Sequence, residues 1–319
     1  MQRVVVTGAT GQIGSELVVE LREIIGGDNV LALGHSRRPG PKMERSGPYI
    51  ALDITDREAL EAAIKEFAPD ALFHLAAVLS GVGESDPPRV WNLNVGGLQN
   101  VLETARKNQL RVFWPSSIGV FGRGYPRDRT PQETVLLPIT MYGVTKVTGE
   151  LLCDYYHRKY GVDVRSVRYP GIISTETLPG GGTTDYAVEI FYEAIKHRRY
   201  RCFVREDTRL PMMYMPDCID AAMKIMLAPE SRISRRDAYN VDDLNFSAGE
   251  LAAEIQRYLP DLQVSYEPDY RQTIADSWPH SLDDSEARRD WGWSPKHDLR
   301  SMTKDMLTKL ERKHKEGLF

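Results

Sequence analysis

A tyrosine and a lysine stand four residues apart in the stretch MYGVTKVTGE, residues 141–150. If this stretch is helical, Tyr142 and Lys146 share one face, although an amphipathic helix also brings such pairs together by chance. A phenol titrates near pH ~10 and is a weak base at neutral pH. A neighbouring ammonium group favours the phenolate and lowers that pKa. The spacing therefore suggests that Tyr142 is a general base and that Lys146 lowers its pKa.

A second chemical signature lies near the N-terminus, where TGATGQIG spaces three glycines as G-x-x-G-x-x-G. Gly8 can take a tight turn, Gly11 lets the backbone approach a pyrophosphate, and Gly14 permits close packing of a helix on a strand. The helix that follows offers unpaired N–H groups to phosphate. Because the glycines separate an apolar β-branched run from a helical pattern, they predict a dinucleotide site rather than a structural turn. The first helical residues of the same predicted site are Gln12 and Ile13.

Strand and helix patterns alternate through the first half of the chain. This alternation is typical of βαβ units and of a parallel sheet that is covered on both faces. The predicted fold is α/β, a Rossmann-like doubly wound parallel sheet. Apolar runs predict strands at 3–7, 29–33, 49–55, 71–77, 110–117 and 163–173, and helical spacing predicts helices at 12–25, 56–67 (with Asp56 as N-cap), 90–108 and from Tyr142 to the closing Gly161.

The pattern changes after residue 174, which we take as the end of a dinucleotide-binding domain, 1–174. The remainder, 175–319, begins with a loop rich in Gly and Thr and continues with helical patterns. We expect it to be a smaller, α-rich, substrate-binding lobe with elements that return to the first domain. Its predicted elements are helices at 186–199, 216–228 and 247–259, the last with a capping box of Ser247 and Glu250, and a possible strand at 264–269.

Several strand ends would meet the dinucleotide in such a fold. His74, in the stretch HLAA, is interpreted as a buried strand histidine that does not touch the cofactor. The predicted contacts are Asp53 and Ile54 at the adenine, and Leu75, Ala76 and Ala77 along the cofactor.

The end of the second strand leaves the choice between NAD and NADP open. An NAD-specific site usually has an acid here, which bonds the adenosine ribose. This chain has His35 and Ser36 instead, followed by Arg37 and Arg38. His35 or Ser36 can still bond a ribose hydroxyl, whereas the arginines either attract a 2′-phosphate or face solvent.

Composition argues against other classes of partner. The 319 residues carry a net charge of −4 and contain no apolar run long enough to cross a membrane, so neither nucleic acid nor a membrane is expected as a partner. Cys153, Cys202 and Cys218 lack the spacing of disulfide frameworks or zinc sites, and Cys153 and Cys218 are interpreted as core residues. No targeting segment is visible, so a cytoplasmic location is the default expectation.

Six motifs occur along the chain in the order TGATGQIG, HLAA, NLNVGG, PSSIGVFG, YGVTK and RYPGII. With this combination the chain resembles the extended short-chain dehydrogenase/reductases, the family that contains the nucleotide-sugar epimerases. The resemblance implies that Tyr142 is the general base and that Lys146 also holds the nicotinamide ribose. It implies that Ser117 orients the reacting oxygen, although Ser116 could exchange roles with it. The cofactor contacts that it adds are Asn94, Tyr169 and Ile172.

The C-terminal half carries a narrower resemblance. The stretches PGGGTTDYAVEIFYEAI, LPMMYMPDCIDA and ADSWPHSLDDSEARRDWGW look like the short-chain type of L-threonine 3-dehydrogenases. That group oxidises the C3 hydroxyl of L-threonine to 2-amino-3-oxobutyrate, passes the hydride to NAD and needs no metal. Its relatives commonly form homodimers, so a homodimer is expected here.

A zwitterionic substrate needs partners at both ends. Thr183 and Thr184 can offer hydroxyl and backbone N–H donors, and Gly180–Gly182 would let their loop hinge over the site. Asp185 is interpreted as the cap of the next helix, and Trp278 either closes the pocket or packs in a core. The candidate substrate-binding residues are Ser80, Ser117, Tyr142, Thr183, Thr184 and Trp278.

Two alternatives to this function stay open. A nucleotide-sugar epimerase or dehydratase would use the same tyrosine and lysine, but would need a long pocket for a nucleotide diphosphate. A dinucleotide-sensing regulator without catalysis would need only the glycine loop, and the intact Ser117, Tyr142 and Lys146 argue against it.

Overall fold

A six-stranded parallel sheet forms the centre of the computed structural model, which describes residues 1–319 apart from the side chain of Val82. The strand order β3-β2-β1-β4-β5-β7 places the first strand in the middle, with crossovers to both sides. This confirms the predicted doubly wound parallel sheet. The strands are β1 (Val4–Thr7), β2 (Val30–Gly34), β3 (Tyr49–Ala51), β4 (Ala71–His74), β5 (Arg111–Phe113) and β7 (Val164–Arg165).

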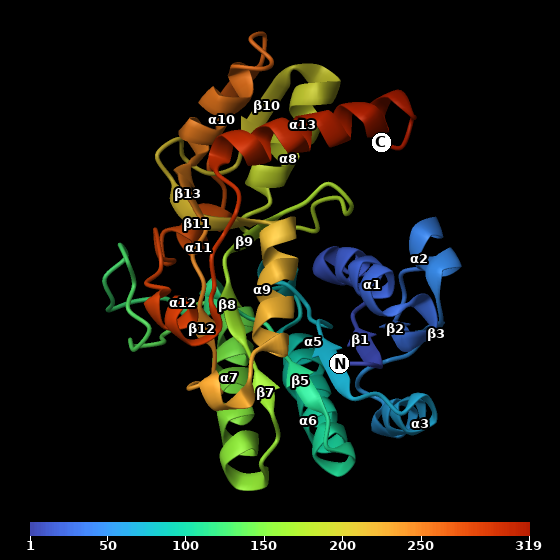
Figure 1. Ribbon diagram of the computed structural model, residues 1–319. Coiled ribbons are helices and arrows are strands. Elements are labelled where there is room, and N and C mark those ends of the chain that lie inside the picture. The colour runs from blue at the N-terminus through green and yellow to red at the C-terminus, as the bar shows by residue number, and fades with distance from the viewer.

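Helices cover both faces of this sheet because its strands send alternate side chains to opposite sides. In β1, Val4 and Val6 pack in one core with α1 and α9, whereas Val5 packs in another core with α3, α6 and α7. Since α9 comes from the C-terminal half, that half completes one face of the sheet (Figure 1). These helices are α1 (Gln12–Ile25), α3 (Arg57–Phe67), α6 (Gly97–Asn108), α7 (Met141–Tyr160) and α9 (Met215–Leu227).

Two predicted strands are divided in the structure. The stretch 110–117 gives β5 and β6 (Ser116–Ser117), and 163–173 gives β7, β8 (Val167–Tyr169) and β9 (Gly171–Ile173). A proline precedes both β6 and β9, and proline cannot donate a ladder hydrogen bond. The later pieces pair in two small sheets, β12-β8-β6 and β13-β11-β9, so the chain crosses from the central sheet towards the second lobe.

The helix predicted at 90–108 also differs in detail. It consists of α5 (Pro87–Trp91), a π-helical turn (Asn92–Gly96) and α6. The predicted capping details hold: Asp56 accepts from the backbone N–H of Ala59, Ser247 and Glu250 form the capping box, and Gly161 ends α7 in the left-handed conformation.

The C-terminal lobe gathers at one end of the molecule in Figure 1, with α8, α10 and α13 around a shared core. It contains more strand than its predicted α-rich character implied. The strand β11 was missed because Pro211 lies inside it, and a proline argues against a strand. The further elements are α2 (Pro41–Ser46), α4 (Ser80–Gly83), α8 (Tyr186–His197), β10 (Arg199–Cys202), β11 (Arg209–Tyr214), β12 (Tyr239–Asn240), β13 (Leu244–Ser247), α10 (Ala248–Gln256), β14 (Gln263–Tyr266), α11 (Arg271–Ala275), α12 (Ser285–Trp291) and α13 (Leu299–Lys315).

Cys153 and Cys218 are core residues as predicted, and Cys202 is buried as well. Within the part of the chain that the structure describes, no helix combines the length and the apolar character needed to cross a membrane.

Candidate active site

The glycine loop between β1 and α1 is as tight as its spacing predicted. Gly8 has φ +66°, and a Cβ on it would lie 2.5 Å from the backbone nitrogen of Ala76. A Cβ on Gly14 would lie 2.3 Å from the carbonyl oxygen of Gly8, so this glycine lets α1 pack on the loop. The N–H of Gly11 donates to the Gly8 carbonyl at 2.9 Å. The loop therefore brings bare backbone to the surface at the end of β1.

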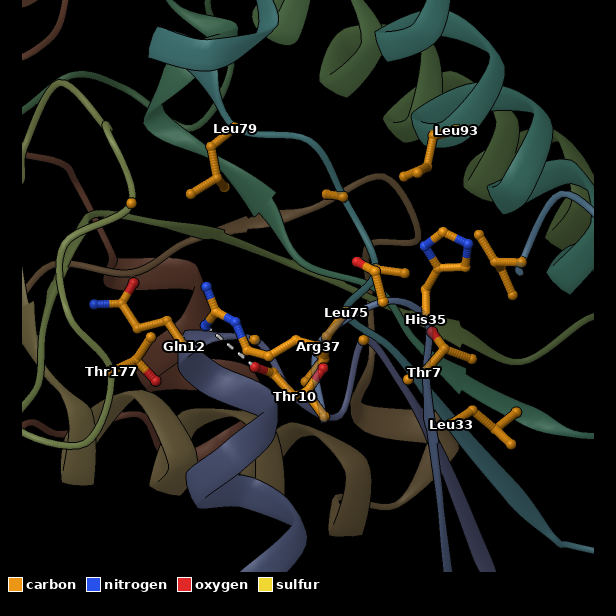
Figure 2. A pocket seen from close by; sticks show the side chains of 18 of the residues that line it. Thr7, Thr10, Gln12, Leu33, His35, Arg37, Leu75, Leu79, Leu93 and Thr177 are labelled. Atoms are coloured by element: carbon orange, nitrogen blue, oxygen red, sulfur yellow. Dashed lines mark hydrogen bonds between the residues drawn. The ribbon is translucent and has the colours of Figure 1, made fainter. Parts of the chain in front are cut away.

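A cleft of about 330 Å³ opens over this loop (Figure 2). It runs from the ends of β2 and β3 across the loop to residues 177–180. The first turn of α1 has no side-chain cap, so its N–H groups are free to meet a phosphate. The donors and the missing side chains therefore fit a dinucleotide. The lining of the cleft includes ten of the predicted cofactor residues, which are Gly8, Gly11, Gln12, His35, Ser36, Asp53, Ile54, Leu75, Ala76 and Ala77.

Seven predicted cofactor contacts do not line the cleft: Ile13, Gly14, Asn94, Tyr142, Lys146, Tyr169 and Ile172. Asn94 accepts from the N–H of Val78 at 2.8 Å and donates to Thr145 at 3.1 Å, so its amide holds a loop against α7. The Tyr169 hydroxyl donates to the carbonyl of Cys218 at 2.7 Å and is buried in the core. Ile13 and Ile172 pack against the core between the sheet and α9, and the Ile172 carbonyl accepts from the Gln12 side chain at 3.1 Å.

His74 is the buried strand histidine that the sequence indicated. Its Nδ1 lies 2.7 Å from the hydroxyl of Thr7, and its Nε2 has no hydrogen-bond partner. Burial, with a smaller contribution from the charge of Lys146, lowers the pKa of His74 to about 3. This side chain is therefore neutral at physiological pH.

A serine, a tyrosine and a lysine converge where α7 begins. Thr140 caps the helix by accepting from the N–H of Gly143, which fixes the first turn that carries Tyr142. The Ser117 hydroxyl, at the end of β6, hydrogen-bonds the phenol of Tyr142. Gly119 leaves room for the ring, since a Cβ there would lie 3.0 Å from it.

The protein groups alone do not lower the pKa of Tyr142. The expected lowering by Lys146 together with the oxidised nicotinamide ring stays a prediction. Burial raises the pKa of this phenol, and the hydrogen bond with Ser117 offsets only part of that rise. The Lys146 ammonium donates to the carbonyl of Pro115 at 2.6 Å and lies 4.7 Å from the ring centre of Trp114 and 5.6 Å from that of Tyr142. Burial lowers the pKa of Lys146 to about 8.

Ser116 and Ser117 lie in different environments. Ser116 donates to Glu150 at 2.5 Å, and Glu150 forms a two-bond ion pair with Arg168 at 2.8 and 2.9 Å, all of it buried. Only Ser117 faces Tyr142. The sequence analysis missed this buried pair, although an arginine inside the apolar run VRYPGII was a signal for it.

The loop before α8 closes the far side of the site. Thr183 is 1% exposed, and its hydroxyl lies 3.4 Å from that of Ser80, so it is not part of a loose surface turn. The carboxylate of Asp185 accepts from the N–H groups of Gly181 and Gly182, each at 2.8 Å. It does not cap α8 as predicted, because it turns back to the glycines. Burial raises the pKa of Asp185.

None of the predicted substrate residues lines the described cleft, and the two not yet placed have packing roles. Thr184 packs against Gly171, where an added Cβ would lie 2.6 Å from the threonine side chain. Trp278 is buried in the core of the C-terminal lobe, which favours the packing interpretation.

The sequence analysis missed the part that Thr177–Gly180 plays in the cleft. Thr177 lies 3.3 Å from the hydroxyl of Ser15, and Gln12 donates to Ser174 at 3.3 Å. Figure 2 shows Gln12 and Thr177 side by side at this end of the cleft. No local motif marks these contacts, because they join residues far apart in the sequence.

Fold and cleft together define a dinucleotide-binding enzyme of the doubly wound class, and comparison with known proteins places it. The chain belongs to the NAD dependent epimerase/dehydratase family, whose model matches residues 4–242. An uncharacterized epimerase/dehydratase of Staphylococcus haemolyticus is 50% identical to it over 98% of this chain and 99% of its own length. A nicotinamide dinucleotide is thus the cofactor of this site.

Among solved structures, L-threonine dehydrogenase from Phytophthora infestans is 50% identical, with a TM-score of 0.94 over 98% of this chain and 99% of that one. A monomeric L-threonine 3-dehydrogenase from a metagenome, solved in its apo form, is 46% identical, with a TM-score of 0.93 over 97% of this chain and 99% of that one.

Proposed function

We propose that this protein oxidises the C3 hydroxyl of L-threonine to 2-amino-3-oxobutyrate and passes the hydride to NAD. The observation that carries the proposal is the cluster in which Ser117 hydrogen-bonds Tyr142 and the Lys146 ammonium lies 5.6 Å from the Tyr142 ring centre. The similarity to L-threonine dehydrogenases supports the choice of substrate, because it extends through the C-terminal lobe.

Each of the three residues has a distinct role in this proposal. The Ser117 hydroxyl orients the C3 oxygen, and the phenolate of Tyr142 takes the C3 hydroxyl proton. Lys146 supplies positive charge while its ammonium is protonated, which its pKa of about 8 allows at neutral pH. A bound, oxidised nicotinamide would supply the hydride acceptor for C3 and a positive charge that favours the phenolate. The rate is therefore expected to depend on an ionisation between roughly pH 6 and 9.

We propose that the hydroxyls of Ser80 and Thr183, which lie 3.4 Å apart, bind the polar end of the substrate. They come from α4 and from the loop before α8, so both segments must be in place for binding. A Cβ on Gly81 would lie 1.9 Å from the carbonyl oxygen of Gly181, which shows how closely the two segments approach.

The test is formation of reduced cofactor from NAD with L-threonine, compared with L-serine, L-allo-threonine and UDP-sugars. L-Threonine is expected to give the highest kcat/KM, and EDTA is expected to leave the rate unchanged. Turnover of a UDP-sugar without turnover of L-threonine would instead identify a nucleotide-sugar enzyme. Loss of activity in EDTA that zinc restores would contradict the metal-independent mechanism.

We also propose that two copies pair through α6 and α7, which pack side by side in the chain. On α7, Val144, Leu151 and Tyr155 are 39, 67 and 50% exposed and follow helical spacing, so they form an apolar outer face. Sedimentation at micromolar concentration is expected to show a dimer, and Leu151→Lys a monomer. A monomeric parent protein, as for the metagenome relative, would contradict the pairing.

A further inference from the structure

The adenosine end of the cleft has no free carboxylate to exclude a phosphate. Strand β2 ends at Gly34, and the following cleft residues are His35, Ser36 and Arg37. In dinucleotide folds an acid at this point bonds the ribose 2′-hydroxyl and disfavours a 2′-phosphate. The described lining of the cleft contains only two carboxylates, those of Asp53 and Asp185.

Both of these carboxylates already have partners. Asp53 accepts from the N–H and the hydroxyl of Thr55 at 2.9 and 2.8 Å, and its other oxygen lies 3.7 Å from Nε2 of His35. Asp185 is bound to the glycine N–H groups at the opposite end of the cleft. Neither carboxylate is therefore positioned as the ribose-binding acid after β2.

Arg37 brings a positive charge to the same place. Its Nη1 donates to the carbonyl of Thr10 in the glycine loop at 3.4 Å, and its own carbonyl accepts from the Tyr49 hydroxyl at 3.3 Å. Figure 2 shows the side chain reaching across the glycine loop towards Thr10, while His35 lies on the side of Leu93. Among the described residues, Arg37 has no carboxylate within ion-pair distance. Arg38 does not line the cleft.

We propose that this site accepts NADP as well as NAD, and that Arg37 is the residue that contacts the 2′-phosphate. An arginine binds phosphate through parallel charge-assisted hydrogen bonds, and the weak 3.4 Å bond to Thr10 leaves its other donors available. The His35 imidazole and the Ser36 hydroxyl supply hydrogen-bonding groups that suit either ribose. This proposal rests on the proposed function for its turnover test. The binding measurements with adenosine phosphates do not depend on which substrate is oxidised.

The experiment is isothermal titration calorimetry with adenosine 5′-monophosphate and adenosine 2′,5′-bisphosphate, which differ only by the 2′-phosphate. The parent protein is expected to bind the bisphosphate at least as tightly as the monophosphate. Arg37→Ala is expected to weaken the bisphosphate by about 10- to 100-fold, the scale of a lost charge-assisted contact. Its affinity for the monophosphate should stay within about threefold. Arg38→Ala is the matched control and should alter neither.

A complementary variant tests the missing acid. His35→Asp is expected to weaken the bisphosphate about 10-fold or more while the monophosphate still binds, because a carboxylate at this point repels the added phosphate. In turnover, the NADP-to-NAD ratio of kcat/KM with L-threonine should fall in Arg37→Ala. If L-threonine is not a substrate, the proposed threonine dehydrogenase activity is wrong. The calorimetry would still decide whether Arg37 contacts a 2′-phosphate.

Two results would overturn the proposal. One is a parent protein that binds the bisphosphate more than about 10-fold more weakly than the monophosphate, since discrimination would then exist without an acid. The other is an equal loss of both ligands in Arg37→Ala, which would assign Arg37 to the 5′-phosphate side. Thermal unfolding of each variant verifies that the fold is retained.

Discussion

The glycine loop at 7–14 and the substrate loop at 174–185 border one cleft, but they are built in different ways. The glycine loop takes its shape from its own backbone, through the positive φ of Gly8 and the bond from Gly11 to Gly8. The substrate loop depends on distant partners. Ser80 and Thr183 are 103 residues apart in sequence, and Lys313 on α13 donates to the carbonyl of Thr175 from 138 residues away.

This difference separates two tasks. Backbone N–H groups and missing side chains suit a cofactor whose phosphates are always the same. The hydroxyls of Ser80 and Thr183, which depend on the packing of distant segments, are the ones we propose to bind the substrate. Substitutions in the glycine loop should therefore affect cofactor binding, and substitutions in the substrate loop should affect substrate binding.

The largest effect is expected at Tyr142 on α7, outside both loops. Tyr142→Phe should lower kcat by about 100-fold or more, because it removes the positioned base. Dinucleotide affinity, measured by calorimetry, should hardly change. The matched pair Ser117→Ala and Ser116→Ala should differ, since only Ser117 bonds the phenol. A Tyr142→Phe enzyme that keeps most of its rate would rule out the mechanism.

The next effect separates two glycines. Gly8→Ala should weaken dinucleotide binding about 10-fold or more, because alanine is disfavoured at φ +66° and its Cβ would meet Ala76. Gly180→Ala has open space around it and should bind dinucleotide normally. Calorimetric titration of both variants makes the comparison, and equal affinities would show that the glycine loop is not the cradle we describe.

A smaller effect is expected in the substrate loop. Asp185→Ala should raise the KM for L-threonine about 10-fold, because the Gly181 and Gly182 N–H groups lose a charged acceptor that shapes the loop. Dinucleotide affinity and kcat should change less. Asp185→Asn, which keeps one acceptor oxygen, should recover part of the KM. An equal loss of cofactor binding would mean that the two regions are not separable.

The smallest effect concerns the junction of α1 with the second lobe. Glu16 is partly buried, and its Oε1 is enclosed without a hydrogen-bond partner. Burial and the charge of Glu176 raise its pKa from 4.5 to about 7, against the opposing charges of Lys309, Lys313 and Lys42. The folded protein thus holds this proton more tightly than the unfolded chain, and the stability it adds is lost as pH rises from 4.5 to about 7. Glu16→Gln should raise the free energy of unfolding by about 1–3 kcal/mol near pH 8 and change it little near pH 4.

Urea unfolding at the two pH values measures this difference. If the free energy of unfolding of Glu16→Gln differs from that of the parent by the same amount at both pH values, Glu16 is not a protonated carboxyl in the folded protein.

The amino-acid sequence determined the features that depend on neighbours in the chain. The spacing of Gly8, Gly11 and Gly14, the apolar strands and the caps at Asp56 and Ser247 all follow from local backbone and side-chain chemistry, and all are present in the structure. The four-residue spacing of Tyr142 and Lys146 likewise predicted one shared helix face, and both residues are buried on α7.

Tertiary structure alone decided the properties that depend on what lies beside a residue in space. The two adjacent serines look alike in sequence, yet Ser116 bonds a buried carboxylate and Ser117 bonds the phenol. The polar groups of Asn94 and Tyr169 hydrogen-bond neighbours that no local sequence pattern reveals. Burial raises the pKa of the Tyr142 phenol, a contribution that no spacing in the sequence reveals. Desolvation and long-range hydrogen bonds arise only when the chain folds, so the surroundings of these residues depend on the tertiary structure.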